Sequence, residues 1–367
     1  MKIVVIGAGQ TGRGLIAPIL KENKFEITFL DKNQELINQL NEKGTYEVAY
    51  FGAVKESVHI DNFKAFHVDS VEAIEAIKSA DLVTTSVFAQ QIESLIPLFE
   101  EGIKKREKSE KLMIICIENG VHVKKPLVEA NLDAYIAEGI IFCTSIRDSR
   151  SLKITSEANI DVPIDGKSLP CHLEIVSMPL DDKFQGLIQR KIYTYNFVSA
   201  VVAYLGSYQG YESYAEAAKD NIIKAYIKEI LIALNKLIAD KFNIDIKEQT
   251  LFSARAIAKF ENKDIYDSIV RNAQQAKRKL GNNERLLTPV HLSIVAKQEY
   301  YHYLVIIAAA LYYGYKYEEL DVKDCLKEIE ECLGIKGISD KIDHIYQKFE
   351  KKENLASIIG GKNEINA

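Results

Sequence analysis

The stretch KIVVIGAGQTGRG, residues 2–14, determines how the first half of the chain folds. After its lysine the run IVVI is wholly apolar, which is typical of a parallel strand buried on both faces. Gly7, Gly9 and Gly12 follow with the spacing G-x-G-x-x-G, and a helical pattern begins directly behind them. The first glycine permits a tight turn, the second lets the backbone approach a pyrophosphate, and the third allows a helix to pack closely on a strand. The stretch therefore predicts a phosphate site at the N-terminus of that helix.

Asp31 extends this prediction to a dinucleotide. It ends the second apolar run, 19 residues after Gly12, where a carboxylate can accept hydrogen bonds from both ribose hydroxyls. Because this carboxylate would repel a 2′-phosphate, we expect NAD rather than NADP, although FAD uses the same glycine pattern. The other residues expected at the cofactor lie between the glycines or at the end of the fourth predicted strand: Gln10, Thr11, Thr84, Thr85 and Ser86. Polar residues are common at strand ends in any case, so the assignment of the last three rests on position alone.

The pattern around this stretch predicts two domains. Apolar runs separated by helical patterns continue through the first half, at 25–31, 81–87 and 111–119, and favour a doubly wound parallel sheet. Short alternating pieces at 45–70 suggest a small antiparallel addition, and a strand-rich segment at 137–178 is expected to extend the sheet. After residue 188 only long helical patterns remain. We therefore predict an α/β Rossmann-type domain at 1–188, an all-α domain at 189–360 and a flexible tail at 361–367.

Composition excludes several classes of function. The chain has 367 residues and a net charge of −5, which gives no reason to expect a nucleic-acid surface. Its five cysteines are widely spaced without a CxxC, which indicates a reducing compartment, and its seven histidines show no metal-binding spacing. No run reaches the roughly 20 apolar residues of a membrane span. We expect a cytoplasmic protein that needs no metal, and the absence of a strong interface signal leaves a monomer open.

Two polar residues interrupt the apolar helical pattern KIYTYNFVSAVVAYLG at 191–206: Lys191 and Asn196. A dehydrogenase of alcohols needs a base for the hydroxyl proton and donors for the developing alkoxide. A lysine can be that base only if burial or a nearby positive charge lowers its pKa from about 10.4 towards neutrality. Asn196 and Ser199 share a helix face, whereas Lys191 lies five residues before Asn196, so convergence requires a distorted first turn or the reach of the lysine. The alternative explanations are a solvated helix-start charge for Lys191, a satisfied core amide for Asn196 and a small packing residue for Ser199, and the helix pattern alone favours them.

These residues are similar to a known family, the long-chain polyol dehydrogenases or mannitol dehydrogenases. The signature helix of that family carries lysine, four residues, asparagine, two residues and histidine; Lys191 and Asn196 match, and Ser199 stands at the histidine position. GAGQTGRG resembles the GAG-x-x-GRG opening of the family, and IICIENG resembles its strand ending in an acidic residue and an asparagine. RKLGNNERLLTP resembles the form found in mannitol-1-phosphate 5-dehydrogenases. The resemblance covers nearly the whole chain and implies a Rossmann-type domain followed by a helical one.

The resemblance also implies roles for individual residues. Lys191 would be the general base, with Asn119 and Asn196 holding the oxyanion, in a reversible NAD(P)-linked conversion of a ketose to a polyol. The expected substrate contacts are Lys259, which stands where the family often has an arginine, and Arg278, Lys279 and Arg285 as candidates for a phosphate. A solvated basic turn is an equal explanation of the last three. Ser199 would leave out the imidazole that positions substrate or lysine in the family.

The expected function is therefore an NAD-dependent oxidoreductase that interconverts a ketose phosphate and a polyol phosphate of the fructose 6-phosphate and mannitol 1-phosphate type. A hexuronate reductase of the tagaturonate or fructuronate type is the alternative within the same class, with the basic residues binding a carboxylate. A second alternative is an NAD-binding paralogue whose turnover is impaired by Ser199 and which acts as a sensor. The expected partners are a small sugar phosphate or sugar acid, with no nucleic acid and no membrane.

Overall fold

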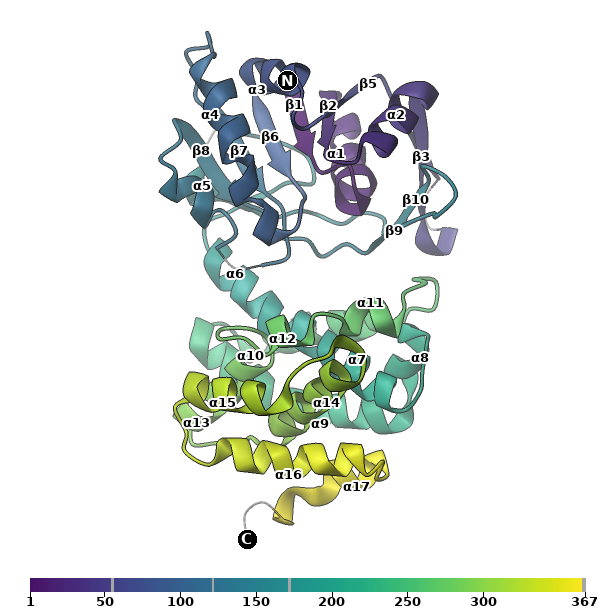
Figure 1. Cartoon of the computed structure of the whole chain (residues 1–367), viewed down its shortest axis with the longest axis vertical. Coiled ribbons are helices and arrows are strands. Elements are labelled where there is room, and N and C mark those ends of the chain that lie inside the picture. Colours follow the sequence, from purple (N-terminus) through teal and green to yellow (C-terminus); the bar gives the residue numbers. More distant parts are fainter. Residues whose placement is uncertain (54–55, 121, 171–172, 365–367) are drawn as a thin grey trace. The chain divides into compact units, whose positions relative to one another are not determined.

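The computed structural model describes residues 1–53, 56–120, 122–170 and 173–364 (Figure 1). The chain divides into two compact units, Met1–Ile188 and Gln189–Ala367. The first contains the strands and the second is helical. Among the described residues, no helix is both long enough and apolar enough to cross a membrane.

A six-stranded parallel sheet forms the centre of the N-terminal unit, in the order β5-β2-β1-β6-β7-β8. Its strands are β1 (Lys2–Ile6), β2 (Glu26–Asp31), β5 (Phe63–His67), β6 (Leu82–Thr85), β7 (Leu112–Cys116) and β8 (Ala134–Glu138). The chain runs outward from β1 to β5 and then returns to β6, so the strand order reverses between β1 and β6. In such a sheet the ligand crevice lies at the carboxyl ends of the strands beside this reversal. The predicted doubly wound Rossmann-type sheet is confirmed.

The apolar run in β1 is continuous because both faces of the strand are covered. Ile3 and Val5 belong to the core on one face, and Val4 and Ile6 belong to the core on the other. The first core includes residues of α1 (Ala17–Glu22) and α2 (Gln34–Lys43), and the second includes residues of α3 (Val71–Ser79) and α4 (Ile96–Lys104). A short helix, α5 (Lys125–Glu129), precedes β8.

The remaining strands differ in part from the sequence prediction. A second sheet has the order β4-β3-β10-β9, built from β3 (Thr45–Tyr50), β4 (Val58–Asp61), β9 (Ser145–Arg147) and β10 (Ile154–Ser156). The pair β3 and β4 is antiparallel, as expected, but the piece at 63–67 became β5, a parallel edge strand of the main sheet. Among the described residues of 137–178, only the end of β8 belongs to the main sheet; β10 pairs with β3 and with β9, and β11 (Ile164–Asp165) pairs with β12 (Leu180–Asp181).

The stretch CHLEIV at 171–176, part of the segment predicted to be strand-rich, shows why pattern alone overestimates strands. Residues 171–172 lie outside the described residues, and 173–176 form no strand. Leu173 and Ile175 are nevertheless buried in the core. Alternation of apolar side chains is therefore satisfied here by packing, without a neighbouring strand.

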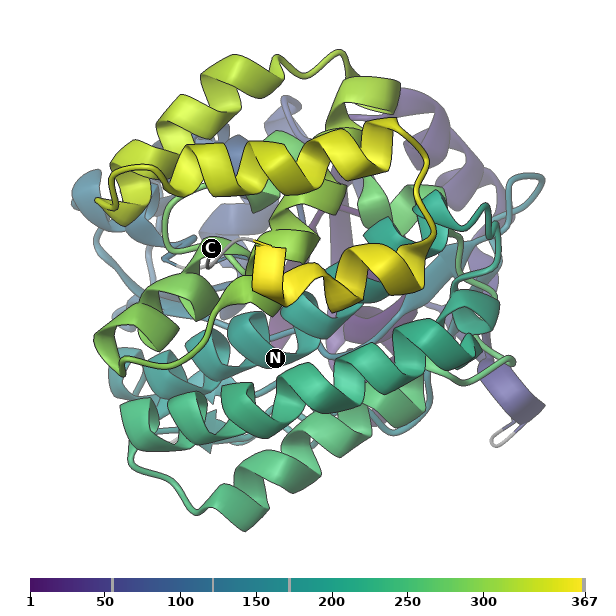
Figure 2. The same cartoon turned by 90° about the horizontal axis from the view of Figure 1, so that it is seen from below.

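The described residues of the C-terminal unit contain helices and no strand, as predicted; one isolated bridge joins Ser213 and Ser268. Its core helices are α7 (Phe197–Tyr208), α9 (Asn221–Phe242) and α14 (Tyr301–Glu318), and α9 lies side by side with α10 (Ile246–Phe260) (Figure 2). The other helices are α6 (Phe184–Lys191), which begins in the first unit, α8 (Tyr214–Lys219), α11 (Ile269–Ala273), α12 (Ala276–Lys279), α13 (Leu287–Val295), α15 (Val322–Leu333), α16 (Ile338–Glu350) and α17 (Leu355–Gly360). The tyrosine-rich α14 is buried along most of its length, as expected of a core helix.

The end of the chain differs from the expected tail over 361–367. Gly361–Glu364 forms a 3₁₀ helix, and the Lys362 ammonium pairs with the Glu299 carboxylate at 3.2 Å. Residues 365–367 lie outside the described residues.

Candidate active site

The three glycines after β1 differ in what surrounds them. Gly7 has a φ of +95°, and a Cβ there would lie 2.6 Å from the carbonyl oxygen of Ser86. A Cβ on Gly12 would lie 2.1 Å from the carbonyl oxygen of Gly7, so neither position accepts a side chain. A Cβ on Gly9 would meet nothing within 4 Å. The backbone at Gly9 is therefore open for the close approach of a phosphate group, which is the fit that a dinucleotide requires.

The helix behind the glycines begins at Gln10 and Thr11 and contains a π turn at Gly12–Ile16. Arg13, in this turn, is buried; its Nε donates to the carbonyl of Ala8 at 2.7 Å and its Nη1 to the carbonyl of Leu152 at 2.6 Å. Burial lowers the pKa of Arg13. The guanidinium thus fixes the glycine loop from inside the domain. The sequence analysis assigned Arg13 no role, although the GRG motif that contains it was quoted as part of the resemblance.

Asp31 lies at the end of β2, directly beside the glycine loop. One carboxylate oxygen accepts from the backbone N–H of Ala8 at 2.8 Å, and the other accepts from that of Asn33 at 2.8 Å. The carboxylate is therefore oriented by the loop that would hold the pyrophosphate. The open backbone at Gly9, the helix N-terminus and this acid together fit a dinucleotide with free ribose hydroxyls.

The polar residues at the end of β6 are engaged within the protein. The Ser86 hydroxyl donates to the carbonyl of Gly7 at 2.8 Å, and the Thr85 hydroxyl donates to the Glu118 carboxyl at 2.7 Å. Thr84 and Thr85 have no exposed surface. The Thr84 hydroxyl has no hydrogen-bond partner among the described residues, and the structure gives no exposed Thr85 oxygen for a ligand.

Glu118 directly precedes the predicted oxyanion donor Asn119. Its only sequence signal was the family pattern of a strand that ends in an acidic residue and an asparagine. It follows β7, is buried, and accepts a second hydrogen bond from the backbone N–H of Val87 at 3.2 Å. Its other oxygen has no hydrogen-bond partner among the described residues. Burial, with a smaller contribution from the nearby Glu138, raises the pKa of this carboxyl to about 8, so Glu118 is largely protonated at neutral pH. Asn119, the predicted oxyanion donor, comes next in the chain and is exposed.

Lys191, the last residue of α6, has the environment that a lysine base requires. It is 6% exposed, and burial lowers its pKa from 10.5 to about 7. The positive charges of Lys259 and Arg285 contribute to this lowering of the pKa, after burial. An amine with this pKa is largely deprotonated just above neutral pH, so it can accept a proton.

A second π turn, at Ile192–Asn196, follows Lys191 directly. The N–H of Phe197 donates to the carbonyl of Ile192, five residues earlier. In an α-helix residues five apart are separated by about 140° around the axis, and a turn closed by an i to i+5 bond reduces that separation. The structure thus contains the distorted first turn that convergence of Lys191 and Asn196 requires. Asn196 and Ser199 are half-buried, and the backbone carbonyl of Ser199 accepts from the Tyr214 hydroxyl at 3.4 Å.

The four predicted substrate residues belong to the same unit as Lys191. Lys259 and Arg285 act on Lys191, and Arg278 and Arg285 both act on Lys279. Lys279 is 5% exposed, its ammonium donates to the carbonyl of Asn272, and burial followed by these two arginines lowers its pKa to about 7. The structure therefore brings Lys191 and Lys259 into one electrostatic cluster with the basic residues of 278–285, from which the sequence separates them.

Glu284 belongs to this cluster and was not predicted. Its carboxylate accepts from Arg278 at 3.0 Å and from Arg285 at 3.2 Å. A substrate anion at these arginines would compete with Glu284. Among the described residues no group of three or more histidine, cysteine and acidic side chains is arranged to hold a metal.

Residues 1–161 match the mannitol dehydrogenase Rossmann domain, and residues 183–363 match the mannitol dehydrogenase C-terminal domain. The chain belongs to the mannitol dehydrogenase family. The resemblance read from the sequence is thereby confirmed. The protein is an oxidoreductase of this family with a Rossmann dinucleotide-binding domain, and as a family enzyme it binds a polyol or sugar substrate.

Curated relatives within the mannitol dehydrogenase family are similar over most of the chain. The mannitol-1-phosphate 5-dehydrogenase of Clostridium acetobutylicum is 27% identical, covering 99% of this chain and 98% of that one. The enzyme of the same name from Enterococcus faecalis is 31% identical, covering 79% and 80%.

Two solved structures share the mannitol dehydrogenase fold at 13% identity. Pseudomonas fluorescens mannitol 2-dehydrogenase, in a ternary complex with NAD and D-mannitol, has a TM-score of 0.72 and covers 100% of this chain and 93% of that one. Substrate-free D-sorbitol dehydrogenase has a TM-score of 0.74, with 98% and 95% covered. At this identity the two structures show the fold alone.

Asp31→Ala tests the choice of cofactor in this mannitol dehydrogenase family member. We expect the preference for NADH over NADPH to fall about 10- to 100-fold, because a hydrogen-bonded carboxylate beside the ribose contributes about 1.5–3 kcal/mol. The measurement is the dissociation constant of each nucleotide by fluorescence titration. Asp69→Ala, at a carboxylate that is 84% exposed in the same unit, is the control. An unchanged ratio in Asp31→Ala would contradict the ribose assignment.

Glu118→Gln tests the buried carboxyl. Because the pKa of Glu118 in the folded protein is raised from 4.5 to about 8, the folded state holds the proton more tightly than the unfolded state. Its contribution to stability is complete below pH 4.5 and is lost as the pH rises to about 8, by up to about 5 kcal/mol. We expect the Tm of the variant to exceed that of the parent at pH 9 and to lose this advantage at pH 5. Glu100→Gln, at an exposed carboxylate, should show no such trend; a pH-independent difference for Glu118→Gln would contradict the assignment.

Proposed function

We propose that the protein is an NAD-dependent dehydrogenase that interconverts a polyol phosphate and a ketose phosphate, of the mannitol 1-phosphate and fructose 6-phosphate type. The observation that carries the proposal is the burial of Lys191 beside Lys259 and Arg285, which lowers the pKa of its amine to about 7. The names of the relatives support the substrate class.

In the direction of oxidation, Lys191 acts as the general base. Its neutral amine accepts the proton of the substrate hydroxyl while the carbon that bears this hydroxyl gives up its hydride. Nicotinamide, when bound, supplies the hydride acceptor. The products are the ketose and an ammonium at Lys191, which then releases its proton to water. In the direction of reduction the Lys191 ammonium returns the proton to the carbonyl oxygen.

Two amides are assigned to the developing alkoxide. Asn196 follows Lys191 by one π turn, and its side-chain NH₂ is a neutral donor of the type that stabilises an oxyanion. Asn119 is the second donor according to the family pattern, and it directly follows the buried Glu118. Ser199 supplies a hydroxyl where the family has an imidazole.

The basic cluster is assigned to the substrate phosphate. Arg278, Lys279 and Arg285 provide two guanidinium groups and an amine, and Lys259 adds a further charge. A dianion at this cluster would favour the protonated form of Lys279, whose pKa of about 7 lies within reach of such a charge. The Glu284 carboxylate holds the two arginines in the absence of the anion.

Lys191→Met tests the general base. We expect kcat for oxidation to fall about 100- to 10,000-fold while the affinity for NADH is retained, because general base catalysis contributes that much. In the parent, kcat for oxidation should rise with pH through about 7 as the amine loses its proton, and kcat for reduction should fall over the same range. Lys228→Met, at an exposed lysine of α9, is the control. Retention of parental kcat by Lys191→Met would reject the proposed function.

Arg278→Gln tests the nature of the anion. We expect the KM for fructose 6-phosphate to rise about tenfold, since a charge-assisted hydrogen bond of about 1.5 kcal/mol is lost, with little change in kcat. Arg271→Gln, which removes a similarly exposed arginine from its pair with Asp267, is the control. A substrate panel with NADH accompanies the variants. Activity of the parent on tagaturonate and none on fructose 6-phosphate would replace the phosphate with a carboxylate, and NADH binding without turnover of any ketose would favour a sensor.

A further inference from the structure

A fully buried glutamine, Gln249 in α10, makes hydrogen bonds on both sides of Lys191. It has 0% exposure. Its carbonyl oxygen accepts from Arg190 Nε at 2.7 Å, and its amide nitrogen donates to Thr194 Oγ1 at 2.9 Å. Arg190 directly precedes Lys191, and Thr194 lies within the π turn that follows it. One side chain therefore ties both flanks of the lysine to α10.

The arginine side of this arrangement is held at several points. Arg190 Nη1 donates to Glu248 at 2.6 Å, and its guanidinium lies 4.2 Å from the ring centre of Phe252. Both residues belong to α10, as Gln249 does. The backbone around Lys191 is thus fixed to a neighbouring helix by an ion pair, a hydrogen bond and a ring contact.

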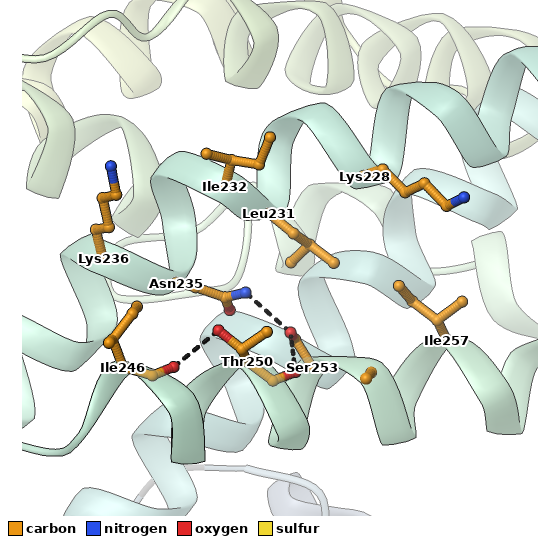
Figure 3. A pocket seen from close by; sticks show the side chains of 10 residues that line it. Lys228, Leu231, Ile232, Asn235, Lys236, Ile246, Thr250, Ser253 and Ile257 are labelled. Atoms are coloured by element: carbon orange, nitrogen blue, oxygen red, sulfur yellow. Dashed lines mark hydrogen bonds between the residues drawn. The ribbon is translucent and has the colours of Figure 1, made fainter.

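The Gln249 amide makes a third hydrogen bond, to a residue of α9. The second N–H of Gln249 donates to Asn235 Oδ1 at 3.1 Å, and Asn235 donates in turn to Ser253 Oγ at 3.0 Å. Asn235 and Ser253 line a groove between α9 and α10, where the bond between them is visible (Figure 3). The Gln249 amide therefore makes three hydrogen bonds, one through its oxygen and two through its N–H groups. Together they fix the orientation of the amide.

We propose that Gln249 is a positioning residue that holds the π turn and, through it, the amine of Lys191 in its buried place. The inference rests on the proposed function of Lys191 as a base. The low pKa of Lys191 depends on burial and on the charges of Lys259 and Arg285, whereas the nearby charge of Arg190 is paired with Glu248. If the turn relaxes, Lys191 loses part of its burial and of its proximity to those charges, so its pKa must rise.

The test compares Gln249→Met with Thr250→Val in the full-length protein. Gln249→Met keeps the volume of the side chain and removes its three hydrogen bonds. Thr250 is the adjacent exposed residue of α10, and its hydroxyl donates to the carbonyl of Ile246 within the same helix. We expect Gln249→Met to lower kcat about 10- to 100-fold, because small misplacements of a reacting group cost that much. The titration of Lys191, followed by ¹⁵N NMR of its Nζ and assigned with Lys191→Met, should move to higher pH. Thr250→Val should change neither.

Thr194→Val provides a milder variant in case Gln249→Met does not fold. It removes only the bond between Gln249 and the π turn, and it should shift the Lys191 titration in the same direction by a smaller amount. An unchanged Lys191 titration in either folded variant overturns the proposal, even if stability falls. The NMR titration requires no substrate, so failure here is distinct from failure of the proposed function, which is decided by the activity of Lys191→Met.

Discussion

The chemistry proposed for the C-terminal unit depends on the desolvation of one ammonium group, that of Lys191. A shift of the Lys191 pKa from 10.5 to about 7 corresponds to a cost on the order of 5 kcal/mol for keeping the amine charged in the folded protein. The protein avoids that cost at neutral pH by releasing the proton, which also makes the amine a base. The π turn that follows Lys191 packs against α7, α9 and α10. Stability and reactivity therefore have the same physical origin in this unit.

Lys191 and Lys279 in the C-terminal unit and Glu118 in the N-terminal unit change the stability of the folded state with pH in opposite senses. Lys191 and Lys279, whose pKa values are lowered to about 7, favour the folded state as the pH rises above that value, because the unfolded chain then binds more protons. Glu118, whose pKa is raised to about 8, disfavours the folded state as the pH rises towards 8. The two effects oppose each other between about pH 7 and 8. All three groups are close to uncharged there, which minimises the number of isolated buried charges.

The sequence predicted those features that depend on local pattern. The buried strand at 2–6, the glycine spacing and Asp31 were found because strand burial and a tight phosphate turn each demand particular residues at fixed intervals. Lys191 and Asn196 were found because they interrupt an apolar helical pattern, and the family resemblance added their expected roles. The π turns were not predictable, since they arise from a shifted register of backbone hydrogen bonds and leave the apolar periodicity almost unchanged. Gln249 and Glu284 were missed because their partners are brought to them only by packing of separate helices.

In each unit a π turn lies in a helix that carries proposed site residues. A buried polar side chain makes hydrogen bonds at each of these turns. At Gly12–Ile16 the Arg13 guanidinium reaches the carbonyls of Ala8 and Leu152; at Ile192–Asn196 the Thr194 hydroxyl accepts from Gln249. A π turn has one residue more than the α-helical turn it replaces and is rare, because its backbone geometry is less favourable. It persists only where the surroundings fix it, and buried hydrogen bonds supply such fixation since leaving them unmade is costly. The extra residue changes the direction of the side chains that follow it. The buried polar side chains that hold each π turn therefore also help to orient the proposed site residues of that helix.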